Sequence, residues 1–110
     1  MEGALTRRLK VEEAKRMVAR IRPWRLAGRY IYRSVKTRDF AEALKLLNRI
    51  ARVAEEANHH PDVELGYGYL RLRLTTHDAG GLTVRDFSLA ERVERVISLW
   101  SRGLRGRRRV

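Results

Sequence analysis

The apolar residues of this chain switch between the helical and the strand period, and the order of the switches limits the folds open to it. Apolar side chains recur every three or four residues in three segments, around 14–21, 40–54 and 87–100. Two pairs of strand-like segments separate them, 24–26 with 30–35 and 63–67 with 70–74. This order predicts an α+β fold: a four-stranded antiparallel sheet with three helices packed on one face.

The segment 70–74 shows the strand period most clearly, because leucine alternates with arginine along it. The leucines should therefore face a core and the arginines solvent. Gly66 and Gly68 interrupt the apolar pattern just before this segment, which predicts a turn near residues 67–69.

Capping residues indicate where the helices begin and end. Pro23 ends the first helix. Asp39, followed three residues later by a glutamate, is typical of a capping box at the start of the second, and Asn58 can take the left-handed conformation that ends it. Thr83 with Asp86 is the corresponding start of the third helix. The apolar stripe expected to be buried on the second helix consists of Phe40, Ala43, Leu44, Leu47, Ile50, Ala51 and Ala54.

A length of 110 residues predicts a single domain. We expect it to span 1–101, with 102–110 as a basic, flexible tail that holds five arginines and no acid. The absence of cysteine excludes disulfides, thiolate metal sites and a cysteine nucleophile. No apolar run is long enough to span a membrane and no signal peptide is evident, so a cytoplasmic protein is expected.

The formal charge of +12 comes from 25 lysines and arginines against 13 acids. The excess lies at the two ends, since residues 39–78 hold five cations and seven acids. Such a charge is compatible with a polyanion partner, and an arginine-rich composition is also typical of heat-adapted, thermostable proteins. No helix carries a basic stripe with base-reading side chains, so binding to nucleic acid should be weak and non-specific.

All three histidines, His59, His60 and His77, lie at the ends of predicted elements and could meet at one rim of the sheet. Imidazole can give or take a proton near neutral pH, so two of them could serve as acid and base. Two alternatives stay open from the residues alone. The histidines could be merely polar surface groups, or they could bind a metal with an oxygen from Asp78 or Glu55, although adjacent imidazoles rarely bind one ion.

The spacing of these residues resembles the pterin-4a-carbinolamine dehydratases. The pattern of that family is an acidic residue, three residues, His-His-Pro, five residues, an aromatic, nine residues, a histidine and a later aspartate. Its slots are filled here by Glu55, His59, His60, Pro61, Tyr67, His77 and Asp86. The resemblance extends more weakly over residues 11–100. It departs from the family where Trp and Asn-Val are usual, since Val63, Leu65 and Gly66 stand there.

The resemblance implies dehydration of 4a-hydroxytetrahydropterin to quinonoid dihydropterin, supporting tetrahydrobiopterin recycling without metal or cofactor. It implies that His59 and His77 are the acid/base pair and that His60 binds the pterin. Substrate-binding positions would be Asn58, Thr75, Thr76 and Asp78, with Glu55, Pro61, Tyr67 and Asp86 in supporting places. Glu55 could instead make a simple contact one helical turn away, and Asp86 could be only a helix cap.

The resemblance also implies a homodimer or homotetramer, in which sheets join edge to edge and helices pack together. Animal members of the family act in addition as dimerisation cofactors of a transcription factor. A non-catalytic binding or regulatory module, or a basic protein associated with nucleic acid, is therefore the alternative to an enzyme.

Overall fold

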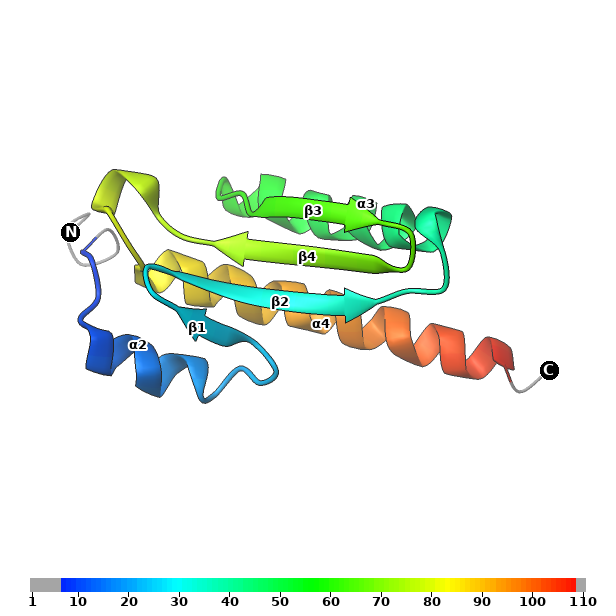
Figure 1. Cartoon of the computed structure of the whole chain (residues 1–110), viewed down its shortest axis with the longest axis horizontal. Coiled ribbons are helices and arrows are strands. Elements are labelled where there is room, and N and C mark those ends of the chain that lie inside the picture. Colours follow the sequence, from blue (N-terminus) through cyan, green and yellow to red (C-terminus); the bar gives the residue numbers. More distant parts are fainter. Residues whose placement is uncertain (1–6, 109–110) are drawn as a thin grey trace.

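The computed structural model describes residues 7–108 of the chain, and its side chains as far as residue 104. The order of elements confirms the predicted α+β class (Figure 1). The elements are α2 (Val11–Val18), β1 (Arg25–Ala27), β2 (Tyr30–Lys36), α3 (Phe40–Ala57), β3 (Asp62–Gly66), β4 (Tyr69–Leu74), the short 3-10 helix η1 (His77–Ala79) and α4 (Val84–Arg108).

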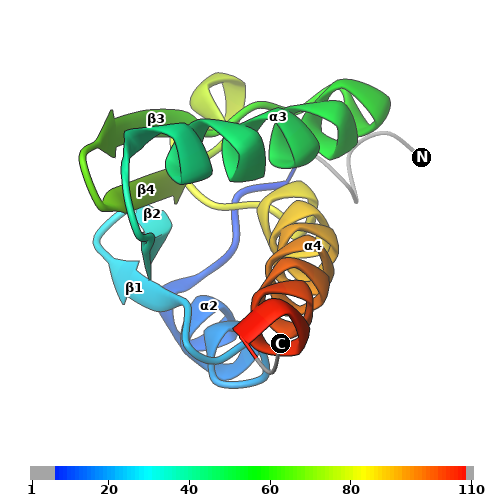
Figure 2. The same cartoon turned by 90° about the vertical axis from the view of Figure 1, so that its right-hand side faces the viewer.

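The four strands form one antiparallel sheet in the order β1-β2-β4-β3. Seen along the long axis of the molecule, the twisted sheet lies on one side and α2, α3 and α4 on the other (Figure 2). The alternation in β4 is as predicted: its three leucines are fully buried and its two arginines are exposed. The core therefore lies between the helices and one face of the sheet.

The face of α3 that is buried differs in part from the prediction. Ala43, Ile50 and Ala54 are buried as expected, but Phe40 and Leu44 are 51% and 43% exposed. Leu46, which the predicted stripe leaves out, is fully buried. Helix α3 packs on α4, β3 and β4, and the positions that face these elements are set by that tertiary packing. The apolar periodicity of the sequence is wide enough to include a second, outward side of the helix.

Both ends of α3 are capped where the sequence predicts. The Asp39 carboxylate accepts a hydrogen bond from the backbone N–H of Glu42 at 2.9 Å. The Glu42 carboxylate accepts from the backbone N–H of Arg38 at 2.7 Å, one residue earlier than in a capping box. Asn58 adopts the left-handed conformation, with φ 49° and ψ 43°.

Helix α4 is longer than the sequence predicts. It continues to Arg108, so residues 102–108, expected to be a flexible tail, are helical. The last turns of α4 project past the ends of the strands (Figure 1). Residues 109–110 of the expected tail lie outside the described residues. Among residues 7–108, no helix is long and apolar enough to cross a membrane.

Candidate active site

The three histidines lie at the same end of the sheet. His59 and His60 connect α3 to β3, and His77 begins η1 just after β4. Asp62 at the start of β3 pairs with Arg73 near the end of β4, so the antiparallel register brings both connections to one end. Within the described residues, no hydrogen bond joins one of these imidazoles to another.

The end of α3 aims His59 into the protein. The backbone N–H of Asn58 donates to the carbonyl of Glu55 at 3.2 Å, and that of His59 donates to the carbonyl of Ala54 at 3.2 Å. These two bonds, with Asn58 in the left-handed conformation, form a Schellman motif. The chain therefore reverses sharply after the helix, and the side chain of His59 is only 10% exposed.

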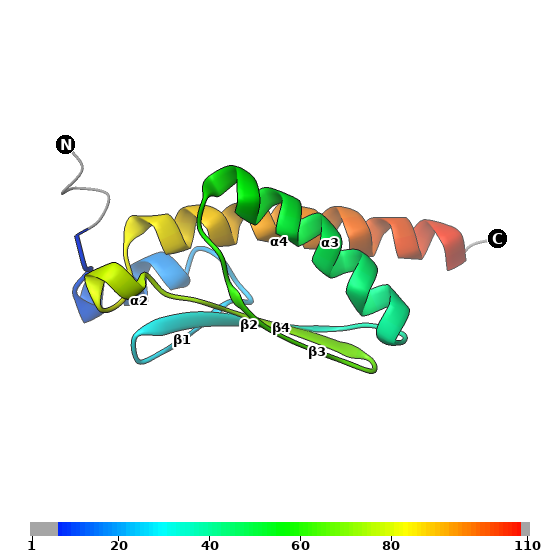
Figure 3. The same ribbon diagram turned by 90° about the horizontal axis from the view of Figure 1, so that it is seen from above.

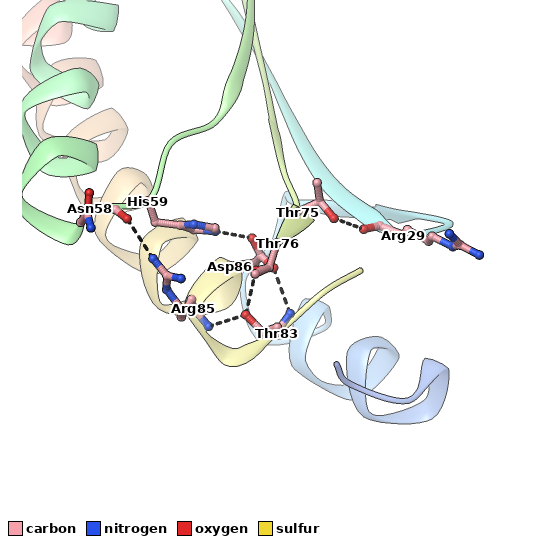
Figure 4. Close-up of polar contacts among 8 residues, drawn as sticks. All are labelled: Arg29, Asn58, His59, Thr75, Thr76, Thr83, Arg85 and Asp86. Carbon is pink, nitrogen blue, oxygen red and sulfur yellow. Dashed lines mark hydrogen bonds and ion pairs between the residues drawn. The ribbon is translucent and has the colours of Figure 1, made fainter. Parts of the chain in front are cut away.

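His59 is paired with a fully buried carboxylate. Its Nε2 lies 2.6 Å from Oδ1 of Asp86, which is in the first turn of α4 and 0% exposed (Figure 4). The other carboxylate oxygen, Oδ2, accepts from the Thr76 hydroxyl at 2.8 Å and from the backbone N–H of Thr83 at 2.9 Å. The two threonines are also buried. Both oxygens of Asp86 are thus held by groups from three separate segments.

The hydrogen bonds of Asp86 indicate which ring nitrogen of His59 carries a proton. The hydroxyl of Thr76 donates to Asp86, so the contact of 2.8 Å between the two threonine hydroxyls has Thr83 as its donor. An ionised Asp86 accepts every bond it makes, and Nε2 of His59 is then the proton donor to it. The same carboxylate also caps α4 through the N–H of Thr83. Asp86 can therefore serve both as a helix cap and as the partner of His59, because the two contacts use different oxygens.

The other ring nitrogen of His59, Nδ1, is the atom left for chemistry. It forms no hydrogen bond with the described residues, among which no buried side-chain nitrogen or oxygen lacks a partner. Nδ1 therefore reaches solvent. A hollow of about 280 Å³ opens beside His59 between the end of α3 and the start of α4. Its other lining residues include Ala57, Arg85, Ser88 and Arg92.

Arg85 and Thr83 belong to this site although sequence reasoning did not select them. Arg85 donates from Nη2 to the backbone carbonyl of Asn58 at 2.8 Å, which ties the first turn of α4 to the end of α3. Thr83 links Asp86 to Thr76. Thr83 was visible in the sequence only as a helix-capping residue, and Arg85 carried no signal beyond its charge.

The remaining polar residues of the motif are exposed. His60 Nε2 contacts the carboxylate of Glu55, so Glu55 lies against His60 and not against His59, one helical turn away. His77 and Asp78 are exposed in η1. The Thr75 hydroxyl donates to the backbone carbonyl of Arg29 at 2.6 Å, which joins the end of β4 to the β1–β2 turn (Figure 4).

Tyr67 does not lie with the histidines in this chain. It is 78% exposed in the β3–β4 turn, at the end of β3 opposite to His60. The five residues of β3 separate Tyr67 from the histidines within the described chain, and its supporting role stays a prediction. Pro61 is half-buried directly before β3.

The donor set does not form a metal centre. Among the described residues, no group of three or more histidine, cysteine, aspartate or glutamate side chains could hold a metal ion. The buried pair already uses Nε2 of His59 and both oxygens of Asp86 in hydrogen bonds.

Sequence relatives indicate the family of this chain. A profile of the family described as pterin 4 alpha carbinolamine dehydratase matches residues 7–96. A protein of Halorhodospira halophila is 44% identical over 85 residues, 76% of this chain and 78% of the relative. A protein of Acidobacterium capsulatum is 47% identical over 74 residues, 67% of this chain and 80% of the relative. Both carry pterin-4-alpha-carbinolamine dehydratase as a provisional name.

Solved structures agree with the fold. The crystal structure of a transcriptional coactivator/pterin dehydratase from Brucella melitensis matches with a TM-score of 0.75 at 27% identity, covering 81% of this chain and 97% of that one. A pterin dehydratase-like protein described as a RuBisCO assembly factor in the alpha-carboxysome matches with a TM-score of 0.55 at 22% identity, covering 66% and 87%, a likeness of fold alone. With the profile match and the two relatives, these findings confirm the resemblance: this chain belongs to the pterin-4-alpha-carbinolamine dehydratase family.

Proposed function

We propose that this protein dehydrates 4a-hydroxytetrahydropterin to the quinonoid dihydropterin by histidine acid/base catalysis. The observation that carries the proposal is the buried pair of His59 and Asp86 in a member of this family. A fully buried carboxylate that receives three hydrogen bonds from separate segments is a costly arrangement, since each of its partners must be held in place. That arrangement is useful when one imidazole must present a defined nitrogen to a substrate.

The reaction needs two proton transfers in opposite directions. The C4a–O bond breaks, and the leaving oxygen takes a proton to depart as water. N5 loses its proton, and its electron pair forms the N5=C4a double bond. One acid and one base are sufficient, and transfers of this kind typically contribute about 10²–10⁴-fold each. His59 would serve through Nδ1 and His77 would serve the opposite role across the substrate.

The other exposed residues of the motif would hold the pterin. His60 lies beside Glu55 at the surface, where a bound ring can reach both. The four expected binding residues lie in the same two segments of the chain as the histidines, after α3 and after β4: Asn58, Thr75, Thr76 and Asp78. Thr76 would act through Asp86, since its hydroxyl is already engaged there.

A dehydration assay tests the proposal directly. Purified protein is mixed with freshly formed 4a-hydroxytetrahydropterin, and the loss of the intermediate is compared with the spontaneous rate. We expect stereospecific acceleration that persists after exhaustive chelation. A rate equal to the spontaneous one would refute the enzyme, and activity that depends on added metal would refute histidine acid/base catalysis.

We also propose that the protein is a homodimer or homotetramer. Both outer strands, β1 and β3, leave a free edge within the described chain, and such edges are usually covered. Phe40 and Leu44 expose apolar surface on the outer side of α3. Light scattering at micromolar concentration should give two or four times the chain mass of 12.9 kDa, and a stable monomer would contradict this assembly.

A regulatory role without catalysis is the alternative function. It is favoured by the description of the Brucella melitensis protein as both a transcriptional coactivator and a pterin dehydratase. The buried pair of His59 and Asp86 argues for the enzyme, because a binding module has no need of it. The dehydration assay separates the two.

A further inference from the structure

One face of the sheet carries no helix. Helices α2, α3 and α4 all lie on the other face, and nothing in the described chain covers this one (Figure 3). In β2 and β4 the buried residues alternate with the residues that point away from the core. We call the uncovered surface the open face, and its central residues are Tyr30, Tyr32, Ser34, Tyr69, Arg71 and Arg73.

The open face presents three half-buried tyrosines. The rings of Tyr30 and Tyr32 are 6.3 Å apart and tilted by 58°. The ring of Tyr69 lies against Gly66 on the neighbouring strand, where a Cβ atom would stand 2.3 Å from the ring. Glycine at this position therefore leaves room for the ring of Tyr69. These rings form an aromatic platform of a kind that antiparallel sheets use for stacking of bases.

The charge on the open face is positive except along one edge. Strands β1, β2 and β4 contain no acidic residue. The guanidinium of Arg71 lies 4.9 Å from the centre of the Tyr69 ring, and that of Arg73 lies 5.3 Å from the centre of the Tyr30 ring. The two acids of this face, Asp62 and Glu64, are on the edge strand β3. Cations interleaved with aromatic rings suit a ligand that has both phosphate groups and flat rings.

We propose that the open face binds single-stranded nucleic acid, with a base stacked on Tyr32 and phosphates on Arg71 and Arg73, whose guanidinium groups lie over the other two rings. A hollow of about 390 Å³ lies over Tyr30, Tyr32, Arg71 and Arg73, with Asp62 and Glu64 of the edge strand also in its lining. It has the size of a small-ligand site. A single strand fits better than a duplex, because the bases of a duplex are stacked on one another and cannot reach the rings. The open face is separate from His59 and Asp86, so this proposal does not depend on the dehydratase.

Binding should be modest, tolerant of sequence and sensitive to salt. Stacking and phosphate contacts read no base edge. With one phosphate on each of the two arginines, the affinity for a single strand should fall about sevenfold between 50 and 200 mM salt. Glu64 competes with phosphate for Arg71, since the two side chains form an ion pair at 3.2 Å.

Fluorescence anisotropy with a labelled 12-residue oligouridylate measures this binding on the full chain. We expect Arg73→Gln to weaken it, and the matched change Arg52→Gln, at an exposed position of α3, to leave it unchanged. Tyr32→Leu should weaken binding about fivefold or more, while Tyr32→Phe keeps the ring and the affinity. Glu64→Gln should tighten binding about two- to fivefold.

Three outcomes would overturn the proposal. Equal losses from Arg73→Gln and Arg52→Gln would mean that only the overall charge attracts the strand. Equal affinity for the corresponding duplex, or for polyglutamate, would mean that the rings play no part. Unchanged affinity in Tyr32→Leu would also mean that the rings play no part. If that variant fails to fold, the comparison of Arg73→Gln with Arg52→Gln and the effect of Glu64→Gln still test the proposal.

Discussion

His59 and His77 belong to one sequence motif, but the fold treats them in opposite ways. His59 is buried, its Nε2 is committed to Asp86, and three segments of the chain meet around that carboxylate. His77 is exposed in a short 3-10 helix, and no hydrogen bond of its side chain is found in the described chain. Folding alone therefore orients His59, whereas we expect His77 to be oriented by a substrate or a partner. Changes at the buried pair of His59 and Asp86 should therefore lower stability, whereas a change at His77 should lower turnover alone.

Removal of the buried carboxylate should have the largest effect. Asp86→Ala leaves the Thr76 hydroxyl, the N–H of Thr83 and Nε2–H of His59 without an acceptor in the interior. We expect a loss of about 3–5 kcal/mol in the free energy of unfolding. The matched change Glu55→Ala removes the exposed carboxylate beside His60 and should cost less than about 1 kcal/mol. Urea unfolding followed by circular dichroism measures the free energy of unfolding of both variants. Similar losses would mean that the fold depends equally on the buried and the exposed carboxylate.

His77→Ala should reduce turnover without changing stability. The side chain is exposed, so the free energy of unfolding should stay within about 0.5 kcal/mol of the wild type. Loss of one acid/base group should lower kcat about 100-fold. A wild-type kcat would remove His77 from the proposed mechanism, and a large loss of stability would show that it is held by the fold after all.

His60→Ala should act mainly on substrate affinity. Removal of one polar contact with the pterin should raise KM about tenfold, while kcat changes less than about twofold. Steady-state kinetics separate the two parameters. A fall in kcat with unchanged KM would assign a proton transfer to His60 in place of His77.

Truncation after Ser101 should have the smallest effect. It removes five arginines and no acid, so the formal charge falls from +12 to +7. The lost turns of α4 project past the sheet, and of residues 102–104 only Leu104 is half-buried. We expect unchanged kcat and a loss of at most about 1 kcal/mol in stability. A truncated chain that does not fold would place the domain boundary beyond residue 101.

The strands and helices could be predicted because the spacing of apolar residues in each segment matches the side that is buried between the sheet and the helices. Leucine–arginine alternation in β4 and the left-handed Asn58 after α3 are both found. The buried face of α3 could not be predicted fully, since Leu44 and Leu46 are both leucines and only tertiary packing buries one of them. The extension of α4 to Arg108 could not be predicted, because the apolar period ends near Trp100 and Gly103 and Gly106 disfavour a helix.

The candidate site was predictable as a set of residues but not as a geometry. The spacing identified His59 and Asp86, which are 27 residues apart, yet only the fold shows that they form a hydrogen bond. The link through Thr83 was hidden by its plainer role as a helix cap. Tyr67 filled its slot in the spacing, but a strand carries it to the far end of the sheet.

The turnover of Asp86→Asn, His59→Ala and the double variant shows whether Asp86 acts through His59. The oxygen of an asparagine at this position stays with Thr76 and Thr83, so its NH₂ group faces His59 and moves the ring proton to Nδ1. We predict that Asp86→Asn lowers kcat about 100-fold or more, and that the double variant is no slower than His59→Ala, because Asp86 acts through His59. Wild-type turnover in Asp86→Asn, or losses that multiply in the double variant, would contradict the account.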